Sequence, residues 1–392
     1  MDRAARDRPL RRGWTTGTCA AAASRAAYQA LLTGVFPDPV EVLLPGGSRP
    51  AFTLAITELG TANLAAPSGL TATPPAAAGR GIDFARAGVV KDAGDDPDVT
   101  HGALIVATVR LGGKGSGVTF AAGEGVGTVT RPGLPLPVGE PAINPVPREM
   151  IRTALAEVAA SHGGGGDAVV ELSIPGGGKI AERTLNGRLG IAGGLSILGT
   201  TGIVVPYSCS AWIHSIYRGI DVARAAGLDH VAGATGATSE AAIARLHGLP
   251  EQALIDMGDF VGGMLKYMRR HPVHRVTIAG GMAKISKLGQ GLLDLHSRRG
   301  EVDLHWLGKR ALEAGGSADL AWRIGQSNSA MEAFGHARDA GVDLPAGVAE
   351  AAWRTAAAAL DGGMLLEIVI FDRSGQWLAG TGFRAAGSHR PA

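Results

Sequence analysis

The second half of the chain repeats one pattern three times: an apolar run, a glycine-containing turn and a helix-like segment. The runs LDHVAGATGA, QALIDMGD and HRVTIAGGMAK are followed by SEAAIARLHG, FVGGMLKYMRRH and KISKLGQGLLDLHS. Strand, turn and helix in succession predict βαβ units around a parallel sheet. Ligands of such sheets bind beyond the carboxyl ends of the strands. These ends fall at residues 233–236, 257–259 and 279–281.

Any one of these turns is equally compatible with an ordinary connection between a strand and a helix. Three of them on one sheet edge favour a nucleotide-like site. The chain has neither G-x-G-x-x-G nor a Walker A sequence, so the usual dinucleotide and triphosphate signatures are absent.

The first half is mixed. CAAAASRAAYQALL predicts a helix that ends at Gly34, and VEVLLP, FTLAIT, ALIVATVRL and GVTFAAG predict strands. VRLGGKGSGVTF is interpreted as two strands joined by a glycine-rich turn. A helix in PREMIRTALAEVAASHGGGG and a strand in AVVELSIP follow. Residues 61–80, rich in Ala, Pro and Thr, are expected to form a surface loop.

A chain of 392 residues favours two domains. The predicted fold class is α+β / α/β: a mixed α+β domain over residues 1–195 and a Rossmann-like βαβ domain over 196–362. The sequence of residues 363–383 predicts a hairpin whose first strand is buried. The sequence allows this hairpin to belong to the second domain or to pair with the sheet of the first domain.

Charge and cysteine content exclude several classes of function. With 37 Lys and Arg against 35 Asp and Glu, nothing indicates a nucleic-acid partner. Two cysteines form neither a disulfide framework nor a four-ligand zinc site, which favours a cytoplasmic protein with no metal site of its own. The basic N-terminus has no apolar core of a signal peptide. Residues 189–217 are uncharged, but Pro206 and five glycines interrupt them, so no membrane span is expected.

Residues 13–23, GWTTGTCAAAA, place three threonines and a glycine directly before a helix. Thr15, Thr16 and Thr18 are N-cap residue types, and Gly17 lets the chain turn. A helix start offers free N–H groups to a carboxylate, so this segment is a candidate anion cradle; a plain capped helix is the alternative. Cys19 has no evident histidine partner and is not expected to be a nucleophile.

Residues 91–102, KDAGDDPDVTHG, gather four aspartates around Gly94 and Pro97. The pattern does not fit an EF-hand. A turn with Asx caps is one interpretation. Because close carboxylates repel each other, the other is that one of them has a raised pKa or binds a ligand group.

Residues 122–134, AGEGVGTVTRPGL, resemble a backbone nest with Arg131 beside it, and GEPAINPVPREM places Asn144 and Arg148 at a helix start. These groups suit an acidic, bulky substrate, whereas the alternative is a glycine-rich turn with a surface arginine. The stretch 186–208, in which Arg188 is the one charged residue, lies between the predicted domains, where ligand sites concentrate.

These five motifs, in this order, resemble the CbiD family of cobalt-precorrin-5B (C-1)-methyltransferases over roughly residues 10–380. IAGGMAKISKLGQGLLDLHS resembles a further family segment, although Ala283 stands where the family pattern has glycine. The resemblance implies an S-adenosyl-L-methionine-dependent methyltransferase. It would methylate ring carbon C-1 of cobalt-precorrin-5B to give cobalt-precorrin-6A on the anaerobic route to cobalamin. Cobalt would enter only as part of the tetrapyrrole substrate, and a homo-oligomer remains open.

The motifs then supply candidate site residues. Substrate carboxylates are expected at Thr15, Thr16, Gly17, Thr18, Glu124, Arg131, Asn144 and Arg148. The methyl donor is expected at Gly199, Thr200, Thr201, Gly202, Gly233, Thr235, Gly236, Asp259, Gly280 and Gly281. A proton is expected to be handled by Asp95, Asp96, Asp98 or His101. Positioning of two bound reactants supplies most of the rate in such a displacement, so no protein nucleophile is required.

Two other functions are compatible with the residues alone. One is another nucleotide-dependent enzyme, such as a dehydrogenase. The other is a non-catalytic corrinoid-binding protein, which would bind the macrocycle without methylating it.

Overall fold

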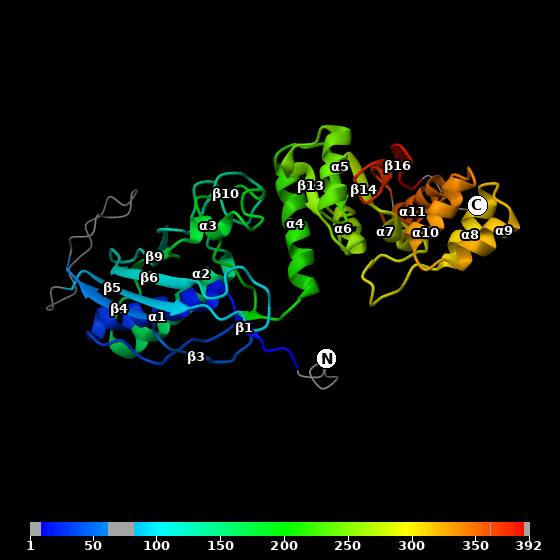
Figure 1. The fold of residues 1–392 in the computed structure, drawn as a ribbon. Helices are drawn as coiled ribbons and strands as arrows, with labels where there is room; N and C mark the ends of the chain where they lie inside the picture. Colours follow the sequence, from blue (N-terminus) through cyan, green and yellow to red (C-terminus); the bar gives the residue numbers. More distant parts are fainter. Residues whose placement is uncertain (1–8, 62–81, 361, 388–392) are drawn as a thin grey trace. The chain divides into compact units, whose positions relative to one another are not determined.

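The computed structural model describes residues 9–61, 82–360 and 362–387. The chain divides into two compact units, Met1–Ser208 and Cys209–Ala392, and each is described by itself (Figure 1). The division lies later in the chain than the 195/196 boundary expected from the sequence. The expected loop at 61–80 falls, except for residue 61, outside the described residues.

The first unit is built on a five-stranded sheet with the order β4-β5-β6-β9-β7. Its strands are β4 (Ile56–Gly60), β5 (Phe84–Val90), β6 (Leu104–Leu111), β7 (Val118–Ala122) and β9 (Ala168–Ser173). Neighbouring strands are antiparallel except β7 and β9, which are parallel. The two strands that the sequence predicts on either side of the glycine-rich turn are confirmed as β6 and β7. They do not pair with each other, because β9 pairs with both strands and lies between them.

Helices α1 (Thr16–Thr33) and α2 (Pro145–His162) pack against each other, and α1 also packs on β5 and β6. The alanine block of α1 is the reason for the close approach. Alanines 20–23, 26, 27 and 30 are completely buried, and their small side chains let the helix lie near the sheet. Thr15 caps the start of α1, and Gly34 ends it in the left-handed conformation at φ 81°, as the sequence predicts.

Shorter elements complete this unit. They are β1 (Gly13–Trp14) paired with β11 (Ile203–Val204), β2 (Val40–Glu41) with β3 (Ala51–Phe52), β8 (Thr128–Val129) with β10 (Ile191–Ala192), and the helix α3 (Gly177–Ala181).

The second unit contains a six-stranded sheet with the order β13-β12-β14-β15-β16, and β17 also pairs with β15. The strands are β12 (His230–Ala234), β13 (Leu254–Asp256), β14 (Arg275–Gly281), β15 (Leu365–Phe371), β16 (Trp377–Gly380) and β17 (Arg384–Ala385). Strands β12, β13 and β14 are parallel, as the repeated pattern predicts, and β15 adds a fourth parallel strand beside β14. Strands β16 and β17 are antiparallel to β15.

Helices cover both faces of this sheet. The helices of this unit are α4 (Cys209–Ala225), α5 (Ala237–His247), α6 (Val261–Met268), α7 (Met282–Gly289), α8 (Leu304–Glu313), α9 (Ala318–Gly325), α10 (Ala330–Asp339) and α11 (Leu344–Leu360). Of these, α8, α9 and α10 pack mainly against one another and against α7 and α11. Successive residues of β15 enter different clusters. Ile368 and Ile370 join the large core with α4, α6, α7 and α11, whereas Val369 and Phe371 join the cluster of α5. Burial on both faces explains why β15 is apolar except for Glu367. The Glu367 carboxylate accepts from the Thr277 hydroxyl and lies 2.7 Å from His247 Nε2.

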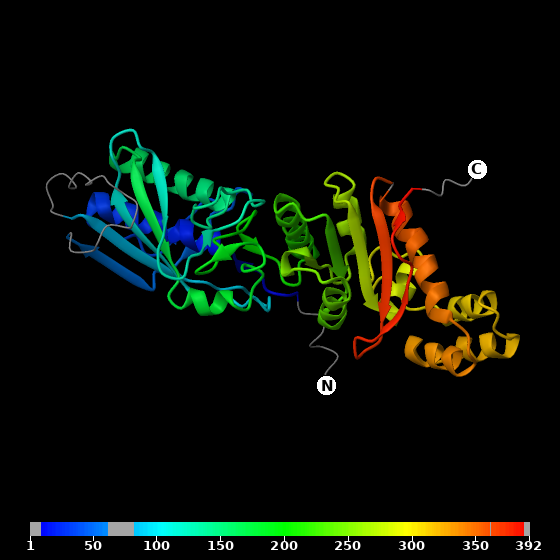
Figure 2. The same cartoon turned by 90° about the horizontal axis from the view of Figure 1, so that it is seen from above.

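The C-terminal hairpin of residues 363–383 joins the second unit. Strand β15 pairs with β14 along its whole length, from Arg275 opposite Leu365 to Gly281 opposite Phe371. Figure 2 shows the red C-terminal strands beside β14. The option that this hairpin rejoins the first domain is thereby corrected, because its backbone donors and acceptors are used within the sheet of the second unit.

Among the described residues, no helix combines the length and apolarity that crossing a bilayer requires.

Candidate functional site

The uncharged segment 194–207 connects the other sequence motifs of the first unit, and we call it the connecting segment. It first contacts the nest: Leu195 N–H donates to Gly125 O at 2.8 Å, and Gly127 N–H donates to Leu195 O at 2.9 Å. It then contacts the start of α2, where Ile197 N–H donates to Ala142 O at 2.8 Å. The glycines of this stretch thus allow backbone-to-backbone contact between distant motifs.

The connecting segment next runs along the start of α1. Thr15 N–H donates to Gly202 O at 3.1 Å, and Gly17 N–H donates to Leu198 O at 3.0 Å. The Thr18 hydroxyl donates to Gly202 O at 2.6 Å. A Cβ on Gly199, whose φ is 131°, would lie 2.4 Å from Thr15 Oγ1. These two segments are therefore packed too closely for any other residue type at this position.

Three N–H donors at the start of α1, those of Gly17, Thr18 and Cys19, are occupied within the protein. Besides Gly17, Thr18 N–H donates to Thr15 Oγ1 at 3.2 Å and Cys19 N–H donates to Thr15 O at 3.2 Å. Thr15, Thr16 and Thr18 are at most 6% exposed. These donors bind the protein itself, which argues against the expected cradle for a substrate carboxylate at this helix start.

Cys19 is completely buried, and burial raises the pKa of its thiol to about 12. A thiol that stays protonated at neutral pH is not an activated nucleophile. This agrees with the expectation from the sequence.

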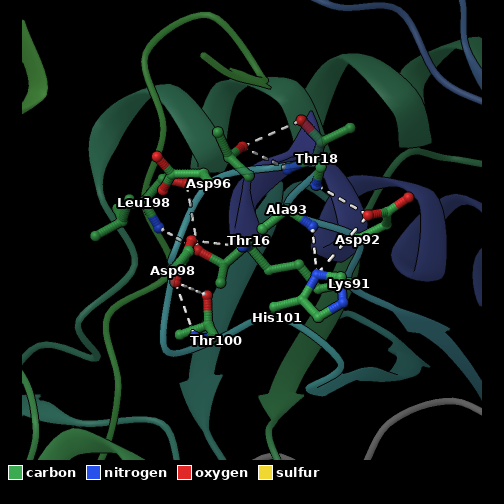
Figure 3. A network of polar contacts seen from close by, with 12 residues as sticks. Thr16, Thr18, Lys91, Asp92, Ala93, Asp96, Asp98, Thr100, His101 and Leu198 are labelled. Atoms are coloured by element: carbon green, nitrogen blue, oxygen red, sulfur yellow. Dashed lines mark hydrogen bonds and ion pairs between the residues drawn. The ribbon is translucent and has the colours of Figure 1, made fainter. Parts of the chain in front are cut away.

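The aspartate loop, residues 91–102, surrounds a buried ion pair (Figure 3). Lys91 is 1% exposed, and its Nζ lies 2.6 Å from Asp98 Oδ2. The backbone N–H and hydroxyl of Thr100 donate to Asp98 Oδ1 at 2.8 and 2.6 Å. Burial raises the pKa of Asp98, but the hydrogen bonds from Lys91 and Thr100 outweigh it, so that the pKa is lowered overall. Asp98 is thus held as a carboxylate and is poorly suited to take up a proton.

The other aspartates of this loop bind the ends of the first unit. The Arg11 guanidinium pairs with Asp92 and lowers the pKa of that carboxyl to about 2. Asp95 Oδ2 accepts from Arg11 N–H at 2.6 Å, and Asp96 Oδ1 accepts from Tyr207 N–H at 2.8 Å. The expected raised pKa is not found for Asp92 or Asp98, because each has a cationic partner.

His101 keeps a hydrogen-bonding atom toward solvent. Its Nδ1 accepts from Ala93 N–H at 3.1 Å, and its side chain is 55% exposed. Because Nδ1 accepts, neutral His101 carries its proton on Nε2. This arrangement makes the ring a donor toward a ligand, whereas the expected role as a proton acceptor would require the other tautomer.

The remaining substrate candidates lie at separate places in the first unit. Arg148 donates to Ile143 O and Glu140 Oε2, both at 2.8 Å, so it holds the chain before α2. Glu124 Oε1 accepts from Gly176 N–H at 3.2 Å. The stem of Arg131 packs over Gly190, where a Cβ would lie 2.5 Å from it. Asn144 is the N-cap of α2, but its side chain makes no capping hydrogen bond.

A cavity of about 380 Å³ in the second unit lies beyond the carboxyl ends of three parallel strands. Thr235 follows β12, Met282 follows β14 and Asp372 follows β15, and all three line the cavity. Hydroxyl groups and charged side chains of the lining are those of Thr235, Thr238, Ser239, Ser329, Lys284, Asp372 and Arg373. Two of the three strand ends expected to form the site, residues 233–236 and 279–281, contribute to this lining, whereas residues 257–259 do not.

The predicted donor-binding residues divide between this cavity and other places. Thr235, Gly236 and Gly281 line it. Gly233 lies within β12, where a Cβ would meet Met264 Sδ at 2.4 Å, and a Cβ on Gly280 would meet Thr235 Oγ1 at 2.8 Å.

Asp259 does not line the cavity but pairs with Lys284, which does. Gly199, Thr200, Thr201 and Gly202 belong to the connecting segment of the first unit. Their glycines pack against the start of α1 and do not line this cavity.

Sequence reasoning missed three charged residues of these sites: Lys91, Asp372 and Arg373. Lysine is rarely buried, so the residue type gives no signal for Lys91, although the preceding run AGVV resembles a buried strand. Asp372 and Arg373 directly follow a predicted buried strand, and this position was the available signal. Within residues 9–61, 82–360 and 362–387, no group of three or more His, Cys, Asp or Glu side chains is arranged to hold a metal ion.

Comparison with known proteins gives the family. The profile described as CbiD matches residues 3–206, and the profile described as CbiD, C-terminal domain, matches residues 294–382. The chain belongs to the CbiD family. A relative from Agrobacterium fabrum, named cobalt-precorrin-5B C(1)-methyltransferase, is 61% identical over 384 residues, which cover 98% of this chain and 95% of the relative.

A second relative agrees with this assignment. A protein of the same name from Paramagnetospirillum magneticum is 55% identical over 371 residues, covering 94% of this chain and 98% of the relative. A crystal structure of the cobalamin biosynthesis protein CbiD from Archaeoglobus fulgidus is 24% identical. It covers 85% of each chain with a TM-score of 0.37.

Proposed function

We propose that this protein is a methyltransferase that transfers a methyl group from S-adenosyl-L-methionine to C-1 of cobalt-precorrin-5B in cobalamin biosynthesis. The observation that carries the proposal is the near full-length similarity to relatives named for this reaction, at 61% identity over 98% of the chain. Cobalt-precorrin-6A would be the product, and cobalt would arrive bound in the substrate.

We infer that the methyl donor binds in the cavity of the second unit, in a Rossmann-like arrangement. A volume of about 380 Å³ falls in the range of small-molecule sites. The lining also fits the chemical groups of the methyl donor, because hydroxyls such as those of Thr235 and Ser239 suit ribose and adenine. Arg373 suits the carboxylate of the methionine part, and Asp372 suits its ammonium group.

The pair formed by Asp259 and Lys284 positions one wall of this site. Lys284 Nζ also donates to Leu295 O at 3.3 Å, so the side chain is held from two sides. We infer that Asp259 acts on the donor through Lys284 and not by direct contact.

We infer that the macrocycle binds to the first unit. Its peripheral carboxylates would meet Asn144, whose side chain makes no capping hydrogen bond, and the donor Nε2 of His101. The start of α1 supports this surface indirectly, because its residues hold the connecting segment in place by hydrogen bonds. These residues are Thr15, Thr16, Gly17 and Thr18. The protein then contributes by orienting two reactants, which accounts for most of the rate of a bimolecular displacement.

The test is to incubate the protein with cobalt-precorrin-5B and S-adenosyl-L-methionine carrying a labelled methyl group, and to weigh the macrocycle by mass spectrometry. One labelled methyl group per macrocycle is expected. A macrocycle that binds but gains no methyl group would contradict the enzyme and leave the corrinoid-binding protein.

Titration calorimetry tests the donor site separately. Arg373→Gln should weaken S-adenosyl-L-methionine binding about tenfold or more, as expected for loss of a charged hydrogen bond. Arg338→Gln, on the exposed part of α10, is the matched control. Equal affinities for both variants would place the donor site elsewhere, and binding of NAD in its place would favour the dehydrogenase.

A further inference from the structure

Tyr207 has a backbone conformation that its residue type disfavours. Its φ is 56°, and within the described part of the chain it is the only residue other than glycine that has a positive φ. It follows Pro206 in a turn, at a position where glycine or asparagine is the common choice. Residues strained in this way concentrate at functional sites.

The side chain of Tyr207 gives no structural reason for this choice. It is 68% exposed, so the ring contributes little to the core. A glycine would adopt the same backbone without strain. The tyrosine ring is therefore available for a contact beyond the core of the first unit.

The structure holds this turn from two sides. Asp96 Oδ1 accepts from Tyr207 N–H at 2.8 Å, across 111 positions of sequence. Just before the turn, β11 pairs with β1, with Val204 opposite Gly13. A strained and exposed residue that is anchored so firmly is presented in a defined orientation.

The anchoring contacts also bring other exposed groups to this place. Leu10 is 53% exposed and precedes Arg11, whose N–H binds Asp95, the neighbour of Asp96. Val205 is 47% exposed. Arg12 is exposed as well. Apolar side chains and a cation therefore border the same pair of aspartates.

We propose that the ring of Tyr207 contacts the flat face of the cobalt-containing macrocycle, and that Asp96 is a positioning residue that acts through the Tyr207 backbone. Aromatic rings favour stacked contacts with flat π-systems. Leu10 and Val205 extend the apolar surface beside the ring, and Arg12 suits a peripheral carboxylate of the macrocycle. This inference rests on the proposed function, because it takes its ligand from there.

The test compares Tyr207→Gly, Tyr207→Phe and the control Trp322→Ala, which removes an aromatic side chain of similar exposure, 65%, from α9. Binding is followed by the absorbance of cobyrinic acid, a cobalt corrinoid with free carboxylates. Tyr207→Gly should weaken binding roughly tenfold, Tyr207→Phe less than twofold, and the control not at all. Because glycine relieves the strained φ, the thermal midpoint of Tyr207→Gly should equal or exceed that of the wild type.

Asp96 is tested by rescue. Asp96→Asn keeps an oxygen acceptor for Tyr207 N–H and should bind the corrinoid nearly as the wild type does. Asp96→Ala should lose several-fold in affinity, with the KM for the macrocycle raised and the KM for S-adenosyl-L-methionine unchanged. A purely structural role would move both constants or neither.

Two results would overturn this inference: wild-type corrinoid affinity in Tyr207→Gly, or a lowered thermal midpoint in that variant, which would make the ring a packing residue. Its failure is distinguishable from failure of the proposed function. If the wild type binds the corrinoid but transfers no methyl group, the reaction fails and the Tyr207 contact is still decided by the binding series.

Discussion

Lys91 and Asp98 form an ion pair in which the lysine is almost completely withdrawn from water, with Nζ 2.6 Å from Oδ2 and 1% of its side chain exposed. A buried ammonium group must have a partner, because desolvation of an unpaired charge costs several kcal/mol. The pair therefore fixes the aspartate loop to the end of strand β5.

Removal of either partner of this ion pair should lower the free energy of unfolding of the first unit. Lys91→Met leaves Asp98 without its cation, and we expect a loss of about 3 kcal/mol in the free energy of unfolding. Urea denaturation followed by circular dichroism measures this loss. Arg338→Ala is the control, because Arg338 and Asp339 form a pair that is 81% and 70% exposed, and it should change the free energy by less than about 0.5 kcal/mol. A similar small change for Lys91→Met would contradict the structural role.

Acid should weaken the first unit through the aspartate loop. The pKa of Asp92 is lowered to about 2 by the hydrogen bond from Arg11, and the pKa of Asp98 is lowered as well. Depressed pKa values stabilise the fold above the unfolded value of 3.8. This stability is lost as the pH falls toward 2, because the unfolded chain takes up the protons first. Hydrogen-exchange protection of β5 and β6 should fall as the pH is lowered from 3.8 toward 2. Asp92→Asn should reduce this dependence of the protection on pH.

The second unit should respond to acid at higher pH. Burial, with His247 and Arg275 nearby, lowers the pKa of His230 from 6.5 to about 4. A histidine that stays neutral in the fold stabilises it above pH 6.5. The stability then declines between pH 6.5 and 4, by at most about 1.4 kcal/mol per pH unit. Exchange protection of β12 and β14 reports this decline, and His230→Gln should flatten it. An unchanged slope in the variant would assign the effect to another group.

The start of α1 should tolerate a change at Cys19 better than one at Gly17. Cys19→Ala keeps a small buried residue and should retain methyl transfer. Gly17→Val should abolish it, because a Cβ there would lie 2.7 Å from Pro147 Cγ and 3.1 Å from Leu198 O. Methyl-transfer rates and circular dichroism of both variants test this contrast, and an active Gly17→Val enzyme would refute it.

Thiol labelling gives an independent check of α1. Cys19 is buried and Cys209 is exposed, so a thiol reagent should modify one cysteine in the native protein and both after unfolding. Rapid labelling of Cys19 under native conditions would contradict the packing of this helix.

Local features of the fold were predictable from the sequence. The Thr15 cap, the stop at Gly34 and the parallel strands β12 to β14 depend on neighbouring residues and on spacing. The pairing of β9 between β6 and β7 was not predictable in the same way. It depends on contacts between Val109 and Val170, and between Phe120 and Val170, which local patterns do not encode.

The candidate site was predictable as a set of motifs but not in its roles. The threonines before α1 and Arg148 carry groups that suit a carboxylate. In the folded chain the same groups bind backbone oxygens such as Leu198 O and Ile143 O. Residue type indicates what a side chain is able to bind, whereas only the fold determines which partner reaches it first.

The most direct test of the proposed function is the position of the transferred methyl group. The purified protein is supplied with cobalt-precorrin-5B and S-adenosyl-L-methionine carrying a carbon-13 methyl group, and the product is examined by NMR after removal of the protein. The account predicts a single labelled methyl group bonded to ring carbon C-1. A label on another carbon, or an unlabelled macrocycle, would contradict it.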